Sequence, residues 1–140
     1  MIKTQTVHFA GMNEDHIRAI RGKVFVEEQN VPSELDFDDE DPGAFHVLVF
    51  SDDIPCGTGR MLDDGHIGRI AVLKEFRGIG LGSIIVEALV NLAIEEQYPR
   101  VYLGSQKHAI GFYQKLGFTT YGEEFLDAGI EHVSMEKLLK

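Results

Sequence analysis

An apolar run that passes through a short charged turn into a glycine-rich loop is the feature that most restricts the fold of this chain. It spans residues 70–83 and reads Ile-Ala-Val-Leu-Lys-Glu-Phe-Arg-Gly-Ile-Gly-Leu-Gly-Ser, and apolar side chains at helical spacing follow in residues 84–96. The segment therefore predicts a strand, a tight loop and the start of a helix. Glycines let backbone N–H groups approach an anion, while the helix N-terminus and Arg77 add positive charge. A diphosphate-containing cofactor is the expected ligand.

Two better-known phosphate loops do not fit these residues. A nucleoside-triphosphate loop ends in Gly-Lys-Ser/Thr, but here Gly82 is followed by Ser83 and Ile84. A dinucleotide fingerprint needs Gly-x-Gly-x-x-Gly and a later acid for the ribose, and the third glycine is one position too early. Both nucleotide classes are excluded on these details.

The order Arg77-x-x-Gly80-x-Gly82 after an Ile-Ala-Val strand resembles the acyl-CoA loop of the GCN5-related N-acetyltransferases, the GNAT superfamily. Residues 109–118, Ala-Ile-Gly-Phe-Tyr-Gln-Lys-Leu-Gly-Phe, resemble the second signature of that family. Residues 21–32, continued by Glu34 and Asp36, together with residues 129–132, Gly-Ile-Glu-His, resemble its ElaA-like (YjcF-like) branch. The resemblance covers nearly the whole chain.

Composition agrees with one enzyme domain over residues 1–140. No apolar stretch approaches the ~20 residues of a membrane span, so no membrane partner is expected. The single cysteine, Cys56, cannot form an internal disulfide, which favours a cytoplasmic setting. With 13 basic and 23 acidic residues the net charge is −10, which disfavours nucleic acid and favours a small cationic partner.

The predicted elements follow the order βαβββαβαββ, which is the GNAT layout: an α/β (α+β) fold with a mixed central sheet flanked by helices. Strands are expected at about 2–9, 44–51, 55–62, 66–73, 100–104, 118–126 and 130–137. Helices are expected from Glu14, capped by Asn13, and at about 79–96 and 107–116, with Gly117 ending the last in a left-handed conformation. Residues 30–43 are expected to form a loop.

The resemblance implies acetyl transfer from acetyl-CoA, as co-substrate, to a primary amine by direct attack, with no metal. Backbone groups of Ile70, Ala71 and Val72 would bind the pantetheine arm, and one N–H would polarise the thioester carbonyl. The diphosphate would lie on the loop Arg77, Gly78, Ile79, Gly80, Leu81, Gly82 and Ser83. Gln106 stands where many members have asparagine, and it is expected to contact the cofactor.

Three residues are candidates for catalysis. Tyr113 matches the tyrosine that protonates the departing thiolate; the alternative is an aromatic that packs over the sheet. His66 lies where some members have a glutamate base; the alternatives are an exposed histidine after a turn, or proton transfer through water. Glu28, with the acids from Glu34 to Asp41, would attract a cationic substrate; the alternatives are a structural contact for Glu28 and a solvated loop for most of the acids.

Several other interpretations stay open. His132 either faces the cleft or is a core or surface-pair histidine. An acyl-homoserine-lactone synthase shares the fold and resembles residues 24–36, although such enzymes are longer. A third possible function is that of a non-catalytic acyl-CoA sensor. The family resemblance alone also suggests a homodimer.

Overall fold

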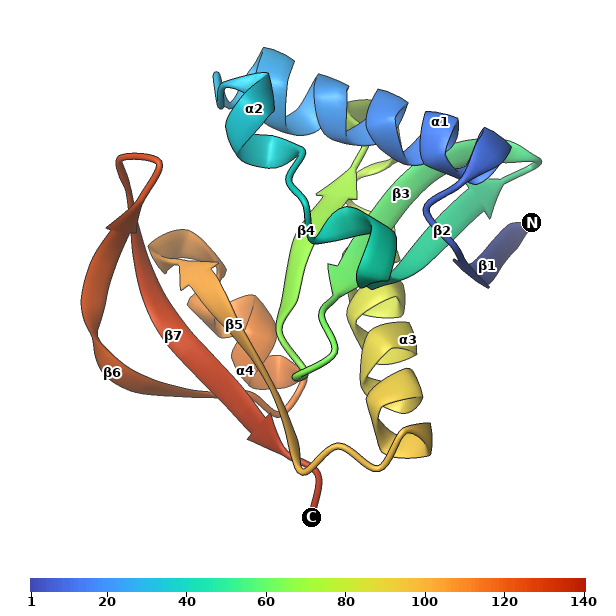
Figure 1. Ribbon diagram of the computed structural model, residues 1–140. Helices are drawn as coiled ribbons and strands as arrows, with labels where there is room; N and C mark the ends of the chain where they lie inside the picture. The colour runs from blue at the N-terminus through green and yellow to red at the C-terminus, as the bar shows by residue number, and fades with distance from the viewer.

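Two small antiparallel sheets that diverge from a shared lower end make up the architecture (Figure 1). The computed structural model describes residues 1–140. One sheet has the order β1 (Ile2–Val7), β2 (Phe45–Ser51), β3 (Ile54–Met61), β4 (Ile67–Val72), and the other has the order β5 (Arg100–Gln106), β7 (Ile130–Leu138), β6 (Thr119–Asp127). The sheets are joined by one parallel bridge between His66 and Tyr102, which makes the central arrangement mixed, as predicted. Above this bridge, β4 and β5 separate.

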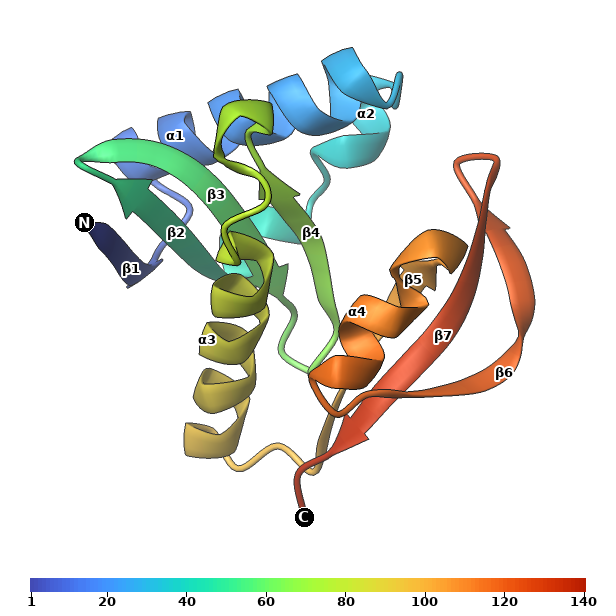
Figure 2. The same cartoon turned by 180° about the vertical axis from the view of Figure 1, so that it is seen from behind.

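The helices cover both faces of the first sheet and one face of the second. α1 (Gly11–Arg21) continues into a π-helical segment, η1 (Gly22–Glu28), and lies across one face of β2–β4, while α3 (Leu81–Glu95) lies on the other (Figures 1 and 2). α4 (Ile110–Lys115) follows a short 3₁₀ turn, η4 (Lys107–Ala109), and covers β5 and β7. The remaining short helices are α2 (Ser33–Asp36), η2 (Asp41–Gly43) and η3 (Lys74–Phe76). None of the helices combines the length and the hydropathy that crossing a membrane requires.

The hydrophobic core lies mainly under α3. Side chains of α3 that recur at helical spacing, including Ile85, Leu89 and Ala93, are fully buried against both sheets. A smaller cluster under α1 joins Ile17 and Ile20 to the first sheet. Because α3 packs on both sheets, it fixes the angle at which β4 and β5 separate.

The predicted order of the main helices and strands is confirmed, with corrections at several boundaries. The first helix begins at Gly11 rather than Glu14, and Ala10 occupies its N-cap without a side-chain hydrogen bond, so the prediction that Asn13 caps the helix is wrong. β5 extends to Gln106, two residues beyond its predicted end. Residues 30–43 contain α2 and η2 rather than a loop alone. Gly117 has φ +95°, as predicted for a left-handed helix end.

Candidate functional site

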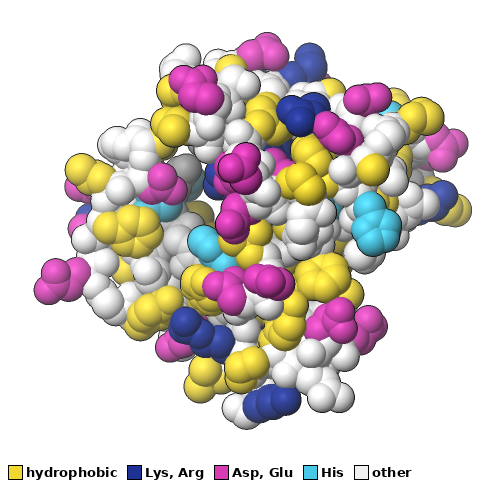
Figure 3. All heavy atoms as spheres, in the orientation of Figure 1, with side chains coloured by type: hydrophobic (Ala, Val, Ile, Leu, Met, Phe, Trp, Pro, Cys, Tyr) yellow, Lys and Arg dark blue, Asp and Glu magenta, His cyan; other side chains and the backbone are white.

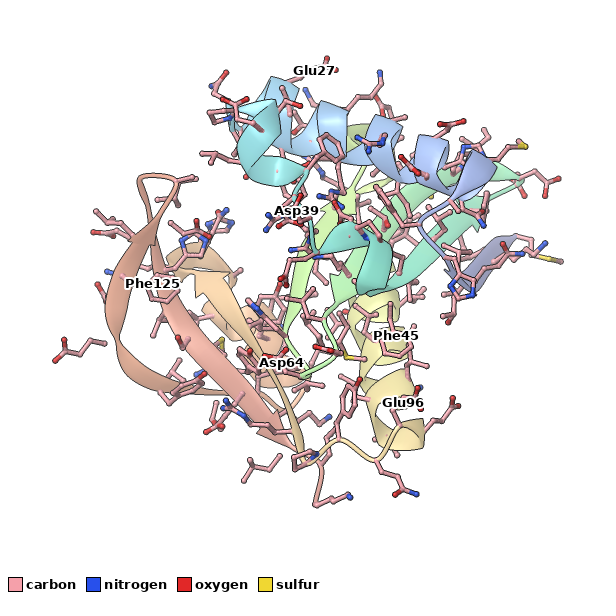
Figure 4. The ribbon with its side chains drawn as sticks, viewed as in Figure 1. Glu27, Asp39, Phe45, Asp64, Glu96 and Phe125 are labelled. Carbon is pink, nitrogen blue, oxygen red and sulfur yellow. The ribbon has the colours of Figure 1, made fainter.

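A cavity of about 630 Å³ occupies the gap between β4 and β5. Its walls come from the lower part of β4, from β5, from the segment between η1 and α2, from α4, and from the β6–β7 hairpin. In Figure 4, Asp64 marks the closed end where the sheets meet, while Asp39 and Phe125 lie on opposite sides of the open end. The cavity therefore runs from the sheet junction up to the segment after η1.

A β-bulge shapes the edge of β4 that borders this cavity. Thr58 pairs with Ala71 and Arg60 pairs with Gly68, so two residues of β4, Arg69 and Ile70, lie opposite the single residue between Thr58 and Arg60. Arg69 has φ +52°, a left-handed conformation that costs a non-glycine residue about 1–3 kcal/mol. The bulge leaves Arg69 and Ile70 out of the regular pairing with β3.

The guanidinium of Arg69 holds this bulge in place. Its Nε donates to the carbonyl oxygen of Asp36 at 3.1 Å, and its Nη2 donates to the carbonyl oxygen of Leu35 at 3.1 Å and to the Asp38 carboxylate at 3.2 Å. These three bonds join the strained residue of β4 to the segment that contains α2. The α2 segment and the bulge therefore form one unit on the cavity wall.

The glycine-rich loop presents unpaired backbone donors at the start of α3. The N–H groups of residues 78–83 donate no hydrogen bond in the loops, turns and caps of the fold, and α3 offers them no acceptor inside its first turn. Gly78 and Gly80 have φ +84° and +86°, and a Cβ on either would meet no atom within 4 Å. Open space, free donors and a helix N-terminus fit a diphosphate.

Arg77 is partly engaged by the protein itself. Its Nε donates to the carbonyl oxygen of Val72 at 2.9 Å, and its Nη2 lies 2.9 Å from Oε1 of Glu28. The Nη1 atom makes no hydrogen bond with the protein. The side chain is thus held beside the loop with one set of donors left for an anion.

Tyr113 enters the cavity from α4. It packs on the main core cluster and makes edge-to-face contacts with Phe112 and Phe118. Burial raises the pKa of the Tyr113 hydroxyl, so the group stays protonated at neutral pH. Its hydroxyl has no hydrogen-bond partner in the protein, which suits a proton donor to a bound molecule.

His66 lies at the closed end of the cavity, where it stacks on Tyr102 with ring centroids 4.7 Å apart. Burial lowers the pKa of the His66 imidazole and keeps it neutral near pH 7. The Tyr102 hydroxyl donates to the Asp64 carboxylate, and burial followed by this hydrogen bond raises the pKa of Tyr102 to about 12. His66 is half-buried, so it is not the exposed histidine that the alternative interpretation expected.

The acidic segment after η1 is largely neutralised by arginines. Arg21 binds Asp41 at 2.7 Å with both side chains 1% exposed, and Arg60 binds Asp38 at 2.7 Å. Burial opposes ionisation of Asp41, but Arg21 and Arg60 outweigh it and lower the pKa of the Asp41 carboxyl. The expectation of a solvated acidic loop is therefore wrong for Asp41, for the equally buried Asp36, and for the ion-paired Asp38.

The cavity brings together some of the predicted site residues and leaves others outside. Tyr113, His66, Ile70 and Gln106 line it. Ala71, Val72 and residues 77–83 lie farther along β4 and in the glycine loop, and Glu28 contacts Arg77 instead of lining the cavity. Arg69 and Phe125 also line the cavity, and neither was predicted from the sequence. Strand alternation could have suggested Phe125, but nothing in the sequence marks the bulge at Arg69.

Comparisons with known proteins give a consistent result. Residues 10–139 match the family model described as the acetyltransferase (GNAT) domain. The uncharacterized N-acetyltransferase YjcF of Bacillus subtilis is 39% identical over 89% of this chain and 94% of YjcF. Protein ElaA of Escherichia coli is 31% identical over 98% of this chain and 97% of ElaA. The ElaA crystal structure superposes with a TM-score of 0.87, at 30% identity over 98% of this chain and 99% of that one.

A more distant structure shares the fold alone. It is a GNAT family acetyltransferase from Elizabethkingia anophelis, solved with acetyl-CoA bound. Its TM-score is 0.69 at 16% identity, covering 99% of this chain and 98% of that one.

Proposed function

This chain belongs to the acetyltransferase (GNAT) domain family and is an acyltransferase enzyme, and we propose that it transfers an acetyl group from acetyl-CoA to the primary amine of a small cationic acceptor. The observation that carries the proposal is the gap between β4 and β5. The two strands are bridged only at His66 and Tyr102, and the space above holds a cavity that a proton donor and a neutral imidazole both line.

The donor would bind along the open edge of β4 and the loop before α3. Leu73 N–H donates to Cys56 of β3, so by strand alternation the backbone groups of Val72 point to the open edge. There the Val72 N–H can pair with the pantetheine arm, while the Val72 carbonyl oxygen accepts from Arg77. The free N–H groups of residues 78–83 would bind the diphosphate, with Arg77 beside them. The acetyl-CoA bound to the Elizabethkingia anophelis enzyme supports this choice of donor.

The reaction we propose is a direct attack of the amine nitrogen on the thioester carbon. The C–N bond forms, the C–S bond breaks, and one proton leaves the amine for an acceptor in the cavity. A backbone N–H in the bulge near Ile70 would stabilise the oxyanion, and Tyr113 would protonate the departing thiolate. In this scheme the proton acceptor is one of the histidines that line the cavity, His66 among them, and Gln106 contacts the donor.

The acceptor is proposed to be cationic because of the protein's charge. The net charge is −10, and Glu34, Asp39 and Glu40 remain exposed after Asp36, Asp38 and Asp41 are paired with arginines. Acidic side chains lie around the centre of the face in Figure 3. Their field would attract an ammonium group toward the open end of the cavity. Glu28 enters the proposal as the residue that orients Arg77.

The setting we propose is the cytoplasm, where the free, buried Cys56 would remain reduced. A homodimer is part of the proposal on family grounds, and sedimentation of the purified protein tests it.

The direct test is a screen of primary amines with acetyl-CoA, following thiol release and confirming the acetylated product by mass spectrometry. Polyamines, arylalkylamines and amino acids form the panel, and release without any amine is the blank. Amine-dependent release with an N-acetylated product supports the proposal. Acetyl-CoA binding without transfer to any amine would instead favour a sensor. Lactone formation from an acylated carrier protein would favour the synthase alternative.

A further inference from the structure

His132 is held in one tautomer on the cavity wall. Its Nδ1 lies 2.7 Å from the carbonyl oxygen of Ile130, which can only accept a hydrogen bond, so Nδ1 carries the proton in the neutral ring. The lone pair is then on Nε2. This atom has no partner in the protein, and it is not among the buried polar atoms that are sealed from solvent. His132 is 8% exposed and lines the cavity, so an unprotonated nitrogen faces the enclosed space.

Three strands fix the orientation of this ring. Phe125 of β6 stacks on His132 with ring centroids 5.7 Å apart and an interplanar angle of 26°. A register shift between Tyr121 and Phe125 brings Phe125 directly opposite His132. On β5, a Cβ at Gly104 would lie 3.1 Å from the Phe125 ring and 3.9 Å from the His132 ring, so glycine provides the room for both. The imidazole is therefore pre-organised and not a mobile surface group.

His132 lies at the level of the bulge, on the face opposite Tyr113. The parallel strands β4 and β5 meet at the bridge between His66 and Tyr102. Ile70 lies four residues beyond His66, and Gln106 lies four residues beyond Tyr102. Gln106 in turn pairs with His132 of β7. Val133 and Met135 face the core cluster on which Tyr113 packs, so by strand alternation His132 faces the other side of the sheet. The two groups approach the gap from opposite faces.

We propose that His132 Nε2 is the proton acceptor for the attacking amine, an inference that rests on the proposed acetyl transfer. As the amine nitrogen bonds to the thioester carbon, one N–H proton passes to Nε2, directly or through one water molecule. The C–S bond then breaks, and the thiolate takes its proton from Tyr113. The alkylammonium loses one proton to solvent before the attack, which frees the lone pair on its nitrogen. After the reaction His132 gives its proton to solvent and Tyr113 takes one up, so these two exchanges cancel and the overall reaction releases one proton from each alkylammonium consumed.

The position of His132 distinguishes it from His66. His66 lies at the closed end, flat against Tyr102 and next to the bridge itself, where the strands leave least room. The titratable and charged groups that face the same cavity from the surrounding elements are His66, Arg69, Asp36, Tyr102, His108, Tyr113, Tyr121 and Asp127. Arg69 and Asp36 are paired with each other, and burial raises the pKa of Tyr102 and Tyr113 and lowers the pKa of His66.

The test uses His132→Asn, whose side-chain amide can still donate to Ile130 but has no atom in place of Nε2. His66→Asn is measured in parallel, and His8→Asn, an exposed histidine at the end of β1, is the control for the substitution itself. For each protein, kcat and KM for an amine found in the screen are followed from pH 5.5 to 9, and acetyl-CoA affinity is measured by calorimetry. In the unliganded wild type, ¹⁵N chemical shifts of the imidazole report the tautomer.

We expect His132→Asn to lower kcat by about 100-fold or more and to change the shape of the pH profile of kcat, with acetyl-CoA affinity within twofold of wild type. We expect His66→Asn to keep the wild-type shape of that profile, and the ¹⁵N shifts of His132 to report a proton on Nδ1. A His132→Asn variant within threefold of wild type at every pH, or a proton on Nε2 in the neutral ring, would overturn the role of His132 alone. A folded wild type that acetylates no amine would overturn the proposed function, and the role of His132 with it.

Discussion

Arg77 and Glu28 form an ion pair, with Nη2 of the arginine 2.9 Å from Oε1 of the glutamate, that connects the glycine-rich loop to the end of η1. The same guanidinium donates through Nε to Val72 at the end of β4. Three separate segments of the chain are thereby joined at the entrance to α3. Because both side chains are more than a third exposed, the pair contributes little to stability, and its role is to orient Arg77.

Glu28→Gln should weaken acetyl-CoA binding by a few-fold and leave kcat at saturation within about threefold of wild type. The amide cannot hold the guanidinium as a carboxylate does, so Arg77 loses its fixed direction. Calorimetry and steady-state kinetics check the two effects, with the exposed Glu27→Gln as the matched control. A 100-fold loss of kcat would instead assign Glu28 a direct part in catalysis.

Gly80→Asp should abolish the stabilisation of the protein by acetyl-CoA. The residue has φ +86° at the N-cap of α3, and a carboxylate there would repel a diphosphate bound to the neighbouring N–H groups. The increase in melting temperature with added acetyl-CoA is the measurement. Gly43→Asp adds the same charge at an exposed position with ordinary φ and should retain the increase. Equal increases in both variants would mean that the loop does not bind the donor.

Tyr113→Phe should lower kcat by about 100-fold while acetyl-CoA affinity stays within about threefold. Burial raises the pKa of Tyr113, so it remains a proton donor up to about pH 10 or beyond, and the wild-type rate should not fall with rising pH through loss of this proton below that value. Tyr98→Phe, which changes a tyrosine that does not line the cavity, is the control. Full activity in Tyr113→Phe would reduce Tyr113 to a packing residue.

Asp41→Asn should lower the free energy of unfolding at pH 7 by about 3–5 kcal/mol, since it leaves the buried Arg21 without its closest anion. The folded-state pKa of Asp41 is lowered, so its stabilisation is complete above the unfolded value of about 3.9 and is lost as the pH falls below it. The difference between variant and wild type should therefore shrink toward pH 3. Urea unfolding at several pH values measures it.

The control for this substitution is Asp39→Asn, in the same segment but exposed. Its free energy of unfolding should lie within about 0.5 kcal/mol of wild type at every pH. An equal loss of unfolding free energy in both variants would show that burial of Asp41 does not increase its contribution to stability.

The order of the main helices and strands and the donor loop could be predicted because local chemistry determines them. Apolar periodicity marks α3, and the glycine pattern marks the turn at which it begins. Tyr113 was found because its position in a signature segment is local as well. The prediction that Asn13 caps the helix was wrong because α1 begins at Gly11, at φ +57°, with Ala10 at its N-cap.

The acceptor side of the cavity could not be predicted because it depends on contacts between distant segments. Arg69 holds a left-handed conformation only because its side chain binds the α2 segment more than thirty residues earlier. The tautomer of His132 depends on a turn geometry that places the Ile130 carbonyl beside Nδ1. From the sequence alone, the acidic segment after η1 cannot be told from a solvated loop. Only the positions of Arg21 and Arg60 in the fold show that several of its acids are paired and buried.

Titration calorimetry of the purified protein with acetyl-CoA, with NAD as the control ligand, is the most direct test of the central claim. We predict one molecule of acetyl-CoA bound per chain and no heat of binding with NAD, because the loop and the open edge of β4 match a diphosphate followed by a pantetheine arm. Absence of acetyl-CoA binding in folded protein, or equal binding of NAD, would contradict it.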